Sequence, residues 1–200
     1  MKQNNPSLFD IKSIDYSKYC GIDEAGRGPI AGPLVVAGVK LFKNIDGLKD
    51  SKKLTAKKRE ELYKIIKESS KYYIYEISAQ KIDEIGLSKA IKEALKAIKE
   101  HFKGSKFIFD GNSSFGVDNI ETLIKADSKV ESVKAASILA KVYRDKLMIK
   151  FAKVYPNYNF DKHKGYCTKA HLEAIAKYGY CEIHRKSFKI NLPSTSHSLI

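Results

Sequence analysis

The sequence predicts an α/β fold in which helices flank a mixed β-sheet. Segments with strand character come first along the chain, and helical segments then alternate with later strands, which is the order expected of such a fold. Of the 200 residues, 43% are hydrophobic, which is enough apolar material for a packed core. The chain shows no internal repeat and no long low-complexity linker. We therefore expect one domain, or one domain with a small appendage.

Short runs rich in β-branched, aromatic and leucine side chains predict the strands of the sheet. The first two cover residues 17–23 and 34–42, and a Gly-Pro turn joins them. Further strands are expected at residues 72–77 and 106–109, with another short extended stretch at 122–125.

Apolar residues spaced three or four apart predict the helices. Residues 54–69 and 87–102 form two of them, and the longest pattern runs from residue 131 to residue 155. Thr168 is expected to cap a further helix that closes at Gly179. In the longest helix, the side chains expected to point inward are Ala135, Ile138, Leu139, Val142, Ile149 and Ala152.

The chain is strongly basic, since 37 Lys and Arg residues against 23 Asp and Glu residues give a formal charge of +14. Such an excess is typical of proteins that bind nucleic acid, although a lysine-rich solvated surface gives the same composition. The cysteines, Cys20, Cys167 and Cys181, lack zinc-ligand or CxxC spacing, which indicates reduced structural thiols. Residues 1–18 lack the apolar centre of a signal peptide, and no apolar run is long enough to span a bilayer. We therefore expect a cytoplasmic protein with no membrane partner.

Acidic side chains follow the predicted strands at several points. Asp23 and Glu24 close the first strand and precede a glycine-rich basic turn, while Asp110 and Asp127 each follow a later strand. Strand ends converge on one rim of the sheet in α/β folds, so these carboxylates are expected to meet there. Carboxylates that meet repel one another unless a cation compensates them, and Mg²⁺ or Mn²⁺ suits a set of oxygen ligands. The pattern therefore favours a divalent-metal site over a solvated acidic turn.

The adjacent pair places one condition on the first strand. Successive residues of a strand face opposite sides of the sheet, so Asp23 and Glu24 should diverge. Both reach one site only if the strand ends or bends at Glu24, and Gly26 and Gly28 make such a bend possible.

Several short motifs follow one another from residue 21 to residue 188. They are Gly21-Ile22-Asp23-Glu24-Ala25-Gly26-Arg27-Gly28-Pro29, Asp50-Ser51-Lys52-Lys53-Leu54, Phe109-Asp110-Gly111-Asn112, Lys125-Ala126-Asp127-Ser128, Ala135-Ala136-Ser137-Ile138-Leu139-Ala140-Lys141-Val142-Tyr143-Arg144-Asp145, His163-Lys164-Gly165-Tyr166 and His184-Arg185-Lys186-Ser187-Phe188. In this order they resemble the ribonuclease HII family, the type 2 ribonucleases H. Arg27 and the short segment before the first strand separate the chain from the related type 3 enzymes. One departure is Ala126, where the family more often has glycine, but the neighbouring carboxylate is kept.

The resemblance implies an RNase H-like core over residues 19–155 and a small helical, substrate-binding extension over residues 156–190. An N-terminal segment, 1–18, precedes the core, and a flexible tail, 191–200, follows the extension. The implied activity is an endonuclease that hydrolyses the RNA strand of RNA–DNA hybrids and incises duplex DNA at single embedded ribonucleotides. Both nucleic acids are then the expected partners, and a monomer is the expected state.

The resemblance also assigns roles by position. The implied catalytic and metal-binding residues are Asp23, Glu24, Asp110 and Asp127, and the implied substrate-binding residues are Gly26, Arg27, Gly28 and Tyr166. A site with two Mg²⁺ or Mn²⁺ ions would leave 3′-hydroxyl and 5′-phosphate ends, with Asp23 best placed to bridge the ions. Further candidates for contacts with substrate phosphates are Lys52, Lys53, Lys164 and Arg185.

Other polar residues are expected to have supporting roles. Asp145 lies within the longest helix, and an ion pair with Lys141, one turn earlier, is preferred to a catalytic role. His163 and His184 are expected to be structural or to bind phosphate. The alternatives for the whole chain are another metal-dependent DNA nuclease or integrase-like enzyme on the same fold, an inactive nucleic-acid-binding module, or a non-enzymatic scaffold.

Overall fold

The computed structural model of the chain describes residues 18–48, 51 and 54–192, and its centre is a five-stranded mixed sheet. The strand order is β3-β2-β1-β4-β5; β1, β2 and β3 pair in antiparallel fashion, whereas β4 and β5 run parallel to β1. The strands are β1 (Tyr19–Ala25), β2 (Leu34–Leu41), β3 (Ser70–Ile77), β4 (Lys106–Asp110) and β5 (Glu121–Leu123). The predicted α/β fold with a mixed sheet is therefore confirmed.

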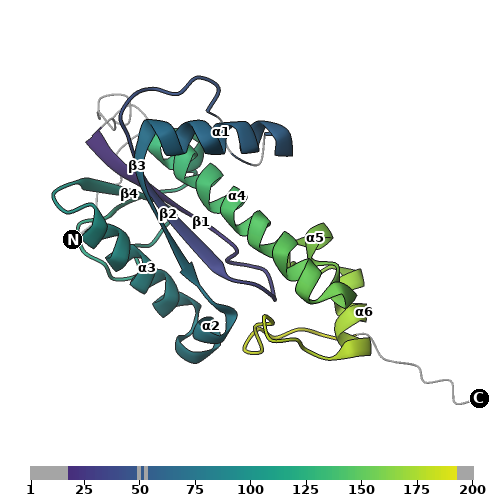
Figure 1. The fold of residues 1–200 in the computed structure, drawn as a ribbon. Helices are drawn as coiled ribbons and strands as arrows, with labels where there is room; N and C mark the ends of the chain where they lie inside the picture. Colours follow the sequence, from purple (N-terminus) through teal and green to yellow (C-terminus); the bar gives the residue numbers. More distant parts are fainter. Residues whose placement is uncertain (1–17, 49–50, 52–53, 193–200) are drawn as a thin grey trace, which may run out of the picture.

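Helices cover both faces of this sheet (Figure 1). The α-helices are α1 (Ala56–Ser69), α2 (Ala79–Ile85), α3 (Leu87–His101), α4 (Glu131–Val154), α5 (Phe160–His163) and α6 (Lys169–Tyr178), and the short 3₁₀ helices are η4 (Ala126–Ser128) and η5 (Pro156–Tyr158). Thr168 caps α6 as predicted, and Thr55 caps α1 in the same way: each hydroxyl accepts a hydrogen bond from a backbone amide of the first turn.

The alternation of side chains along the central strands sends them into two separate cores. Leu34 and Val36 of β2 pack with α3, whereas Val35, Ala37 and Val39 pack with α1 and α4. The same alternation operates in β1 and β4. It decides which helical layer each polar side chain at the end of those strands faces.

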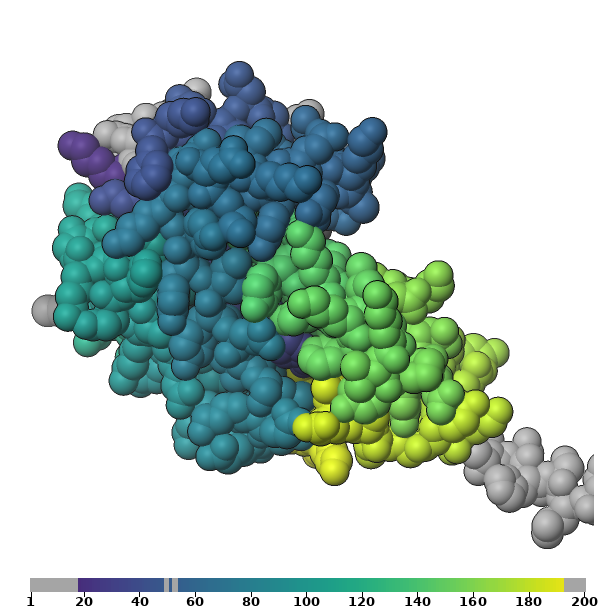
Figure 2. All heavy atoms as spheres, viewed as in Figure 1, coloured from purple at the N-terminus to yellow at the C-terminus, as the bar shows by residue number. Residues whose placement is uncertain are grey.

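The C-terminal part packs against the far half of α4 and against the loop after β1 (Figure 1). Ile30 and Ala31 of that loop share an apolar cluster with Met148, Phe160 and residues of α6. Ala31 also forms a β-bridge with His184. In the space-filling view these green and yellow atoms form a lobe beside the strand-rich part (Figure 2).

The structure corrects three details of the predicted elements. The first strand does not end at residue 23, because β1 keeps its pairing with β2 through Ala25. Helix α2 was not predicted, since only two of its seven residues are buried and its apolar pattern is short. Ile149 does not point inward: it is 45% exposed, and Met148 occupies the buried position on that turn of α4.

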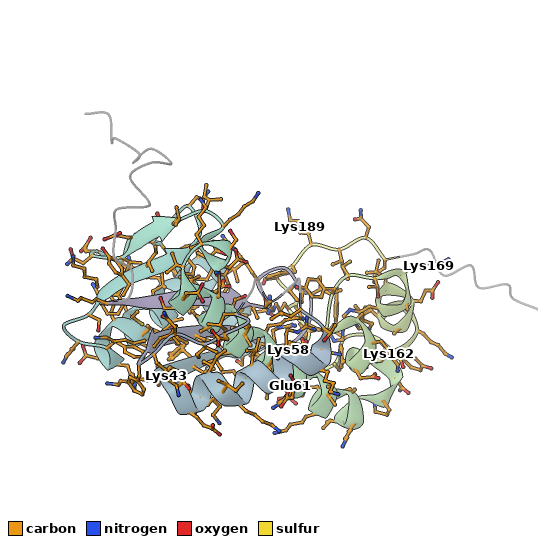
Figure 3. The ribbon with its side chains drawn as sticks, turned by 90° about the horizontal axis from the view of Figure 1, so that it is seen from above. Lys43, Lys58, Glu61, Lys162, Lys169 and Lys189 are labelled. Atoms are coloured by element: carbon orange, nitrogen blue, oxygen red, sulfur yellow. The ribbon has the colours of Figure 1, made fainter. Side chains whose placement is uncertain are left out.

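Lysine side chains are spread over several sides of the surface. Figure 3 shows Lys43, Lys58, Lys162, Lys169 and Lys189 on different parts of the exterior. Much of the positive charge is therefore a solvated surface, as the alternative interpretation of the composition has it. Within the described ranges, no helix is both long and apolar enough to cross a membrane.

Gly21 marks the closest approach of β1 to α4, and replacing it tests this packing. A Cβ atom at Gly21 would lie 2.3 Å from the backbone of Ser132 and Val133. We expect Gly21→Ala to lower the free energy of unfolding by roughly 3 kcal/mol, because backbone atoms must move to make room. Gly28→Ala is the matched control, since a Cβ there has no neighbour within 4 Å. Equal stability of the two variants in urea unfolding would contradict this packing.

Candidate active site

Three aspartates from separate segments meet at one end of the sheet. Asp23, Asp110 and Asp127 each offer a carboxylate oxygen, and these oxygens all lie within 4.8 Å of one another. Asp23 is 7% exposed and Asp127 is 4% exposed, so the cluster is largely removed from water. The predicted convergence of these three carboxylates is present in the structure.

The pleat of β1 and β4 aims two of these side chains at the same helical layer. Ile22 and Phe109 belong to the core on the α3 side, so Asp23 and Asp110, one residue later, face α4. The backbone amide of Ala126 donates a hydrogen bond to Asp110 Oδ1 at 2.9 Å. That contact ties the start of η4 to the end of β4, and η4 carries Asp127. Asp127 is therefore placed by a 3₁₀ turn rather than by the end of a strand.

Glu24 reaches the site differently from the way the sequence suggested. β1 continues past Glu24, which is not among the three carboxylates within 4.8 Å of one another, yet Glu24 lines the same cavity as Asp23. Its Oε1 lies 3.5 Å from Arg27 Nη1. Its Oε2 is buried and has no hydrogen-bond partner. The sharp change of direction comes only at Gly26, whose φ is +94°.

Burial and neighbouring negative charges raise the pKa of Asp23 and of Glu24. The pKa of Asp23 lies well above its ordinary value because of burial first, and then because of the negative charges of Glu24 and Asp110. Burial also raises the pKa of Glu24; Arg27 opposes that shift and Asp110 adds to it. Like charges held this close favour a bound cation.

The donor set fits a hard divalent cation. All its ligand atoms are carboxylate oxygens, and the buried, unpartnered Oε2 of Glu24 lacks the partner that such an atom normally has. Mg²⁺ and Mn²⁺ accept such ligands, whereas zinc sites usually include histidine or cysteine. Asp23, Asp110 and Asp127 would hold such an ion, with Glu24 adjacent.

A cavity of about 460 Å³ opens beside the cluster. It is lined by Asp23, Glu24, Ala25, Gly26, Arg27, Gly28, Ser51, Asp110, Ser137, Lys141, Arg144 and Tyr166. The glycine-rich turn and Tyr166 were predicted to bind substrate, and both border the same space as the carboxylates. Tyr166 is 48% exposed, so its ring is open to a ligand. The guanidinium of Arg27 lies over the ring of Phe115, 5.4 Å from its centre, in a cation–π contact.

Arg185 does not have the place that was predicted for it. It is 1% exposed, and its guanidinium donates hydrogen bonds to the carbonyls of Gly32, Arg27 and Gly26 at 2.9, 3.2 and 2.6 Å. Burial lowers its pKa to about 9. A buried side chain whose three guanidinium nitrogens each donate to a backbone carbonyl supports the glycine-rich turn, and this corrects the prediction of a phosphate contact.

Arg144 supports the same region from α4. It donates to the carbonyls of Pro33, Ala31 and Lys164 at 2.9, 3.0 and 2.9 Å. It thereby joins the loop after β1 to the loop that carries Tyr166. The motif around Arg144 was recognised in the sequence, but nothing in the spacing indicated which carbonyls it would reach.

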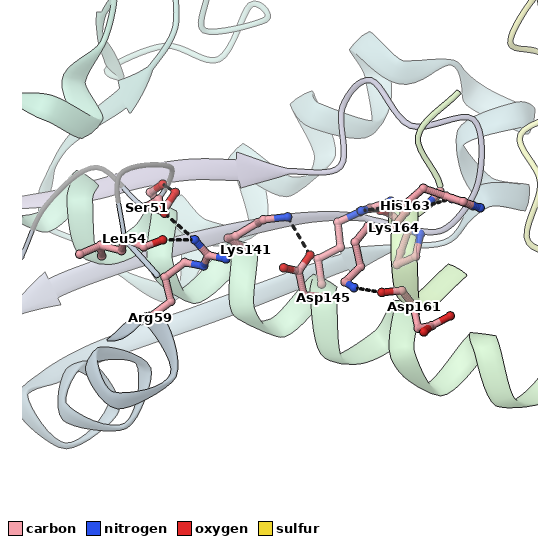
Figure 4. A network of polar contacts seen from close by, with 12 residues as sticks. Ser51, Leu54, Arg59, Lys141, Asp145, Asp161, His163 and Lys164 are labelled. Carbon is pink, nitrogen blue, oxygen red and sulfur yellow. Dashed lines mark hydrogen bonds and ion pairs between the residues drawn. The ribbon is translucent and has the colours of Figure 1, made fainter. Parts of the chain in front are cut away.

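Three lysines remain of the residues predicted to contact substrate phosphates. Lys52 and Lys53 lie outside the described residues. Lys164 donates from its ammonium group to the carbonyl of Asp161 (Figure 4). Its contact with a phosphate stays a prediction.

Three contacts shown in Figure 4 fix neighbouring parts of the cavity. Arg59 of α1 donates to the carbonyls of Ser51 and Leu54, at 3.0 and 2.6 Å. Lys141 Nζ lies 2.8 Å from Asp145 Oδ1, so the predicted ion pair within the longest helix is confirmed.

A sequence model of the ribonuclease HII family matches residues 20–191. The chain belongs to the ribonuclease HII family. Ribonuclease HII of Sulfurovum is 60% identical over 171 residues, covering 86% of this chain and 91% of the relative. Ribonuclease HII of Campylobacter concisus is 57% identical over 183 residues, covering 92% and 99%.

Solved structures agree. Ribonuclease HII from Archaeoglobus fulgidus, in its complex with PCNA, matches with a TM-score of 0.74 and 28% identity, over 89% of this chain and 98% of that one. Ribonuclease H2 from Pyrococcus horikoshii matches with a TM-score of 0.67 and 29% identity, over 86% and 93%. As a ribonuclease HII, the chain is a metal-dependent endoribonuclease that acts on the RNA strand of RNA–DNA hybrids.

Asp110→Asn tests the cluster directly. The amide oxygen can still accept the hydrogen bond from Ala126, so the fold is kept while a negative charge is lost. We expect hybrid cleavage to fall by at least about 10³-fold, as for the loss of a group that acts only in the transition state. Binding of the hybrid, measured by fluorescence anisotropy, should change less than about threefold. Retained cleavage would remove Asp110 from the site.

Proposed function

We propose that this ribonuclease HII also incises duplex DNA at single embedded ribonucleotides, using Mg²⁺ or Mn²⁺ at a two-ion site. The observation that carries the proposal is the shared cavity. Asp23 and Asp110 of the aspartate cluster, the turn from Gly26 to Gly28, and Tyr166 all border it, so chemistry and recognition of one nucleotide can occur together.

The carboxylates would bind the two ions in different ways. Asp23 is the best candidate to contact both ions, because the oxygens of Asp110 and Asp127 lie within 4.8 Å of its own. Glu24 has a free acceptor atom that can complete one shell. When bound, such a pair of ions supplies activation of the attacking water and stabilisation of charge on the departing oxygen.

The reaction is hydrolysis of one phosphodiester bond. The oxygen of water bonds to phosphorus, the bond from phosphorus to the 3′ oxygen breaks, and that oxygen takes up a proton. The products are a 3′-hydroxyl end and a 5′-phosphate end. This chain's part is to place the phosphate beside the aspartates that would hold the ions, and the turn and tyrosine that line the same cavity provide a surface for it.

Only a 2′-hydroxyl distinguishes a ribonucleotide from its DNA neighbours. The backbone at Gly26 and Gly28 carries no Cβ, so its polar groups can approach a sugar closely. The carbonyls of Gly26 and Arg27 are already engaged by Arg185, which holds the peptide planes of the turn in one orientation. A fixed orientation favours recognition of one hydroxyl position over a general contact with the backbone of the nucleic acid.

Tyr166 lines the same cavity. Its exposed ring can stack on a sugar or base next to the ribonucleotide, and such stacking contributes ~1–3 kcal/mol. We propose the C-terminal extension, residues 156–190, as the substrate-binding part because it carries this residue. A monomer and a cytoplasmic location stay predictions.

A labelled duplex with one embedded ribonucleotide tests the proposal. With Mg²⁺ we expect one phosphodiester bond to be cut, on the 5′ side of that ribonucleotide. We expect no cut with EDTA in place of Mg²⁺, and none in an all-DNA duplex. Tyr166→Ala should reduce kcat/KM on this duplex by roughly 5- to 100-fold, the range given by the lost stacking. Tyr178→Ala is the matched control, because Tyr178 is similarly exposed, at 46%, and does not line the cavity.

Two outcomes would overturn parts of this proposal. Cleavage of a long hybrid without any nick at the lone ribonucleotide would limit the activity to hybrids. Cleavage of branched DNA without ribonucleotides would instead favour the alternative of a DNA nuclease on the same fold.

A further inference from the structure

The loop that carries Tyr166 has its backbone fixed at every step. Lys164 donates its amide to Phe160 and offers its carbonyl to Arg144. The carbonyl of Gly165 accepts from the amides of Ile30 and Ala31, at 2.9 and 3.3 Å. A Cβ on Gly165 would lie 2.3 Å from the carbonyl oxygen of Ala31, so this loop and the loop after β1 touch along their backbones.

A chain of hydrogen bonds through two buried histidines ends on Tyr166 itself. His171 Nδ1 lies 2.8 Å from the carbonyl oxygen of Tyr166, and His171 Nε2 lies 3.0 Å from His184 Nε2. At the other end, His184 Nδ1 lies 2.9 Å from the amide nitrogen of Cys181 and 3.1 Å from its Sγ. His171 and His184 are 0% and 1% exposed.

The groups at the two ends of this chain of hydrogen bonds determine which ring nitrogen of each histidine carries a proton. A carbonyl oxygen can only accept, so His171 carries its proton on Nδ1 and leaves Nε2 as an acceptor. His184 must then donate from Nε2, which leaves its Nδ1 free to accept from the amide of Cys181. Both rings are therefore neutral and have a single tautomer. Burial lowers the pKa of each to about 4, in agreement with that assignment.

His163 completes the support. Its Nε2 lies 2.7 Å from the carbonyl oxygen of Tyr158, and its Nδ1 accepts from the amide of Gly165 at 3.2 Å. Its ring stacks on that of His171, with 4.2 Å between centres and 18° between planes. The residue before Tyr166 and Tyr166 itself are thus held by adjacent, stacked imidazoles.

We propose that His171, oriented by His184, is a positioning residue that sets the place of the Tyr166 ring for recognition of the ribonucleotide. The role rests on the proposed function of Tyr166. The donor acts on the carbonyl of the residue whose side chain faces the cavity, so a small rotation of that peptide displaces the ring. Neither histidine lines the cavity, and neither contacts the reacting atoms.

Two substitutions at one position separate this role from packing. In His171→Asn the side-chain amide takes the place of Nδ1 and can still donate to Tyr166. In His171→Gln the side chain reaches the place of Nε2 and loses that donor. We expect His171→Gln to raise KM on the single-ribonucleotide duplex by about tenfold, because a displaced Tyr166 ring loses part of its stacking on the substrate. The value of kcat should be nearly unchanged. His171→Asn should stay within about threefold of wild type.

The loop can also be observed without metal or substrate. The chain contains no tryptophan, so Tyr166→Trp introduces a single fluorescent reporter at the site. In this background His171→Gln should lower the fluorescence anisotropy of the indole, and His171→Asn should not. In a Tyr166→Ala background, His171→Gln should add less than a twofold effect on KM, because the positioned ring is already gone.

The outcomes separate the two proposals. Equal losses in both His171 variants, with unchanged anisotropy, would show that His171 only packs and would overturn the positioning role. Wild-type incision by Tyr166→Ala would instead overturn the proposed function of Tyr166, while the anisotropy still decides whether His171 fixes the loop. If either variant fails to fold, His184→Gln, which keeps a donor toward His171, and His184→Ala, which lacks it, give the same comparison.

Discussion

The mutual repulsion of buried carboxylates at the end of the sheet is the constraint on which the rest of the structure depends. Two adjacent strands and a 3₁₀ turn bring Asp23, Asp110 and Asp127 together where little water can screen them. Burial of that much negative charge is unfavourable unless a cation or hydrogen-bond donors compensate it. Until a cation binds, the surrounding fold must hold the groups together against their repulsion. The close approach of β1 to α4 at Gly21 is part of that support.

Beside the cluster, the polar interior serves mainly to fix backbone. Arg144 and Arg185 are buried cations whose donors go to carbonyls of the loop after β1 and of the Tyr166 loop. The histidines stack beneath the second of these loops. The result is a rigid frame in which a glycine turn and an exposed tyrosine line one cavity. Rigid placement of recognition groups is what discrimination of a single hydroxyl requires.

The sequence predicted the parts of this design that depend on local pattern. Strand and helix periodicity identified the layers, and acidic residues after apolar strands identified Asp23 and Asp110, because strand ends meet at one rim. The pair of Lys141 and Asp145 followed from helical spacing alone. Sequence could not predict the direction of Arg185, since its partners lie more than 150 residues earlier in the chain. It also misplaced the end of β1, because pairing with β2 holds Glu24 in the strand despite the glycines that follow.

The most direct test of the account is the stability of wild type and Asp110→Asn in urea, with and without Mn²⁺. If repulsion within the cluster is the governing cost, removal of one charge should raise the free energy of unfolding in metal-free buffer by roughly 1 kcal/mol. Mn²⁺ should then stabilise the wild type more than the variant. A variant that is less stable than wild type without metal, and that gains as much from Mn²⁺, would contradict the account.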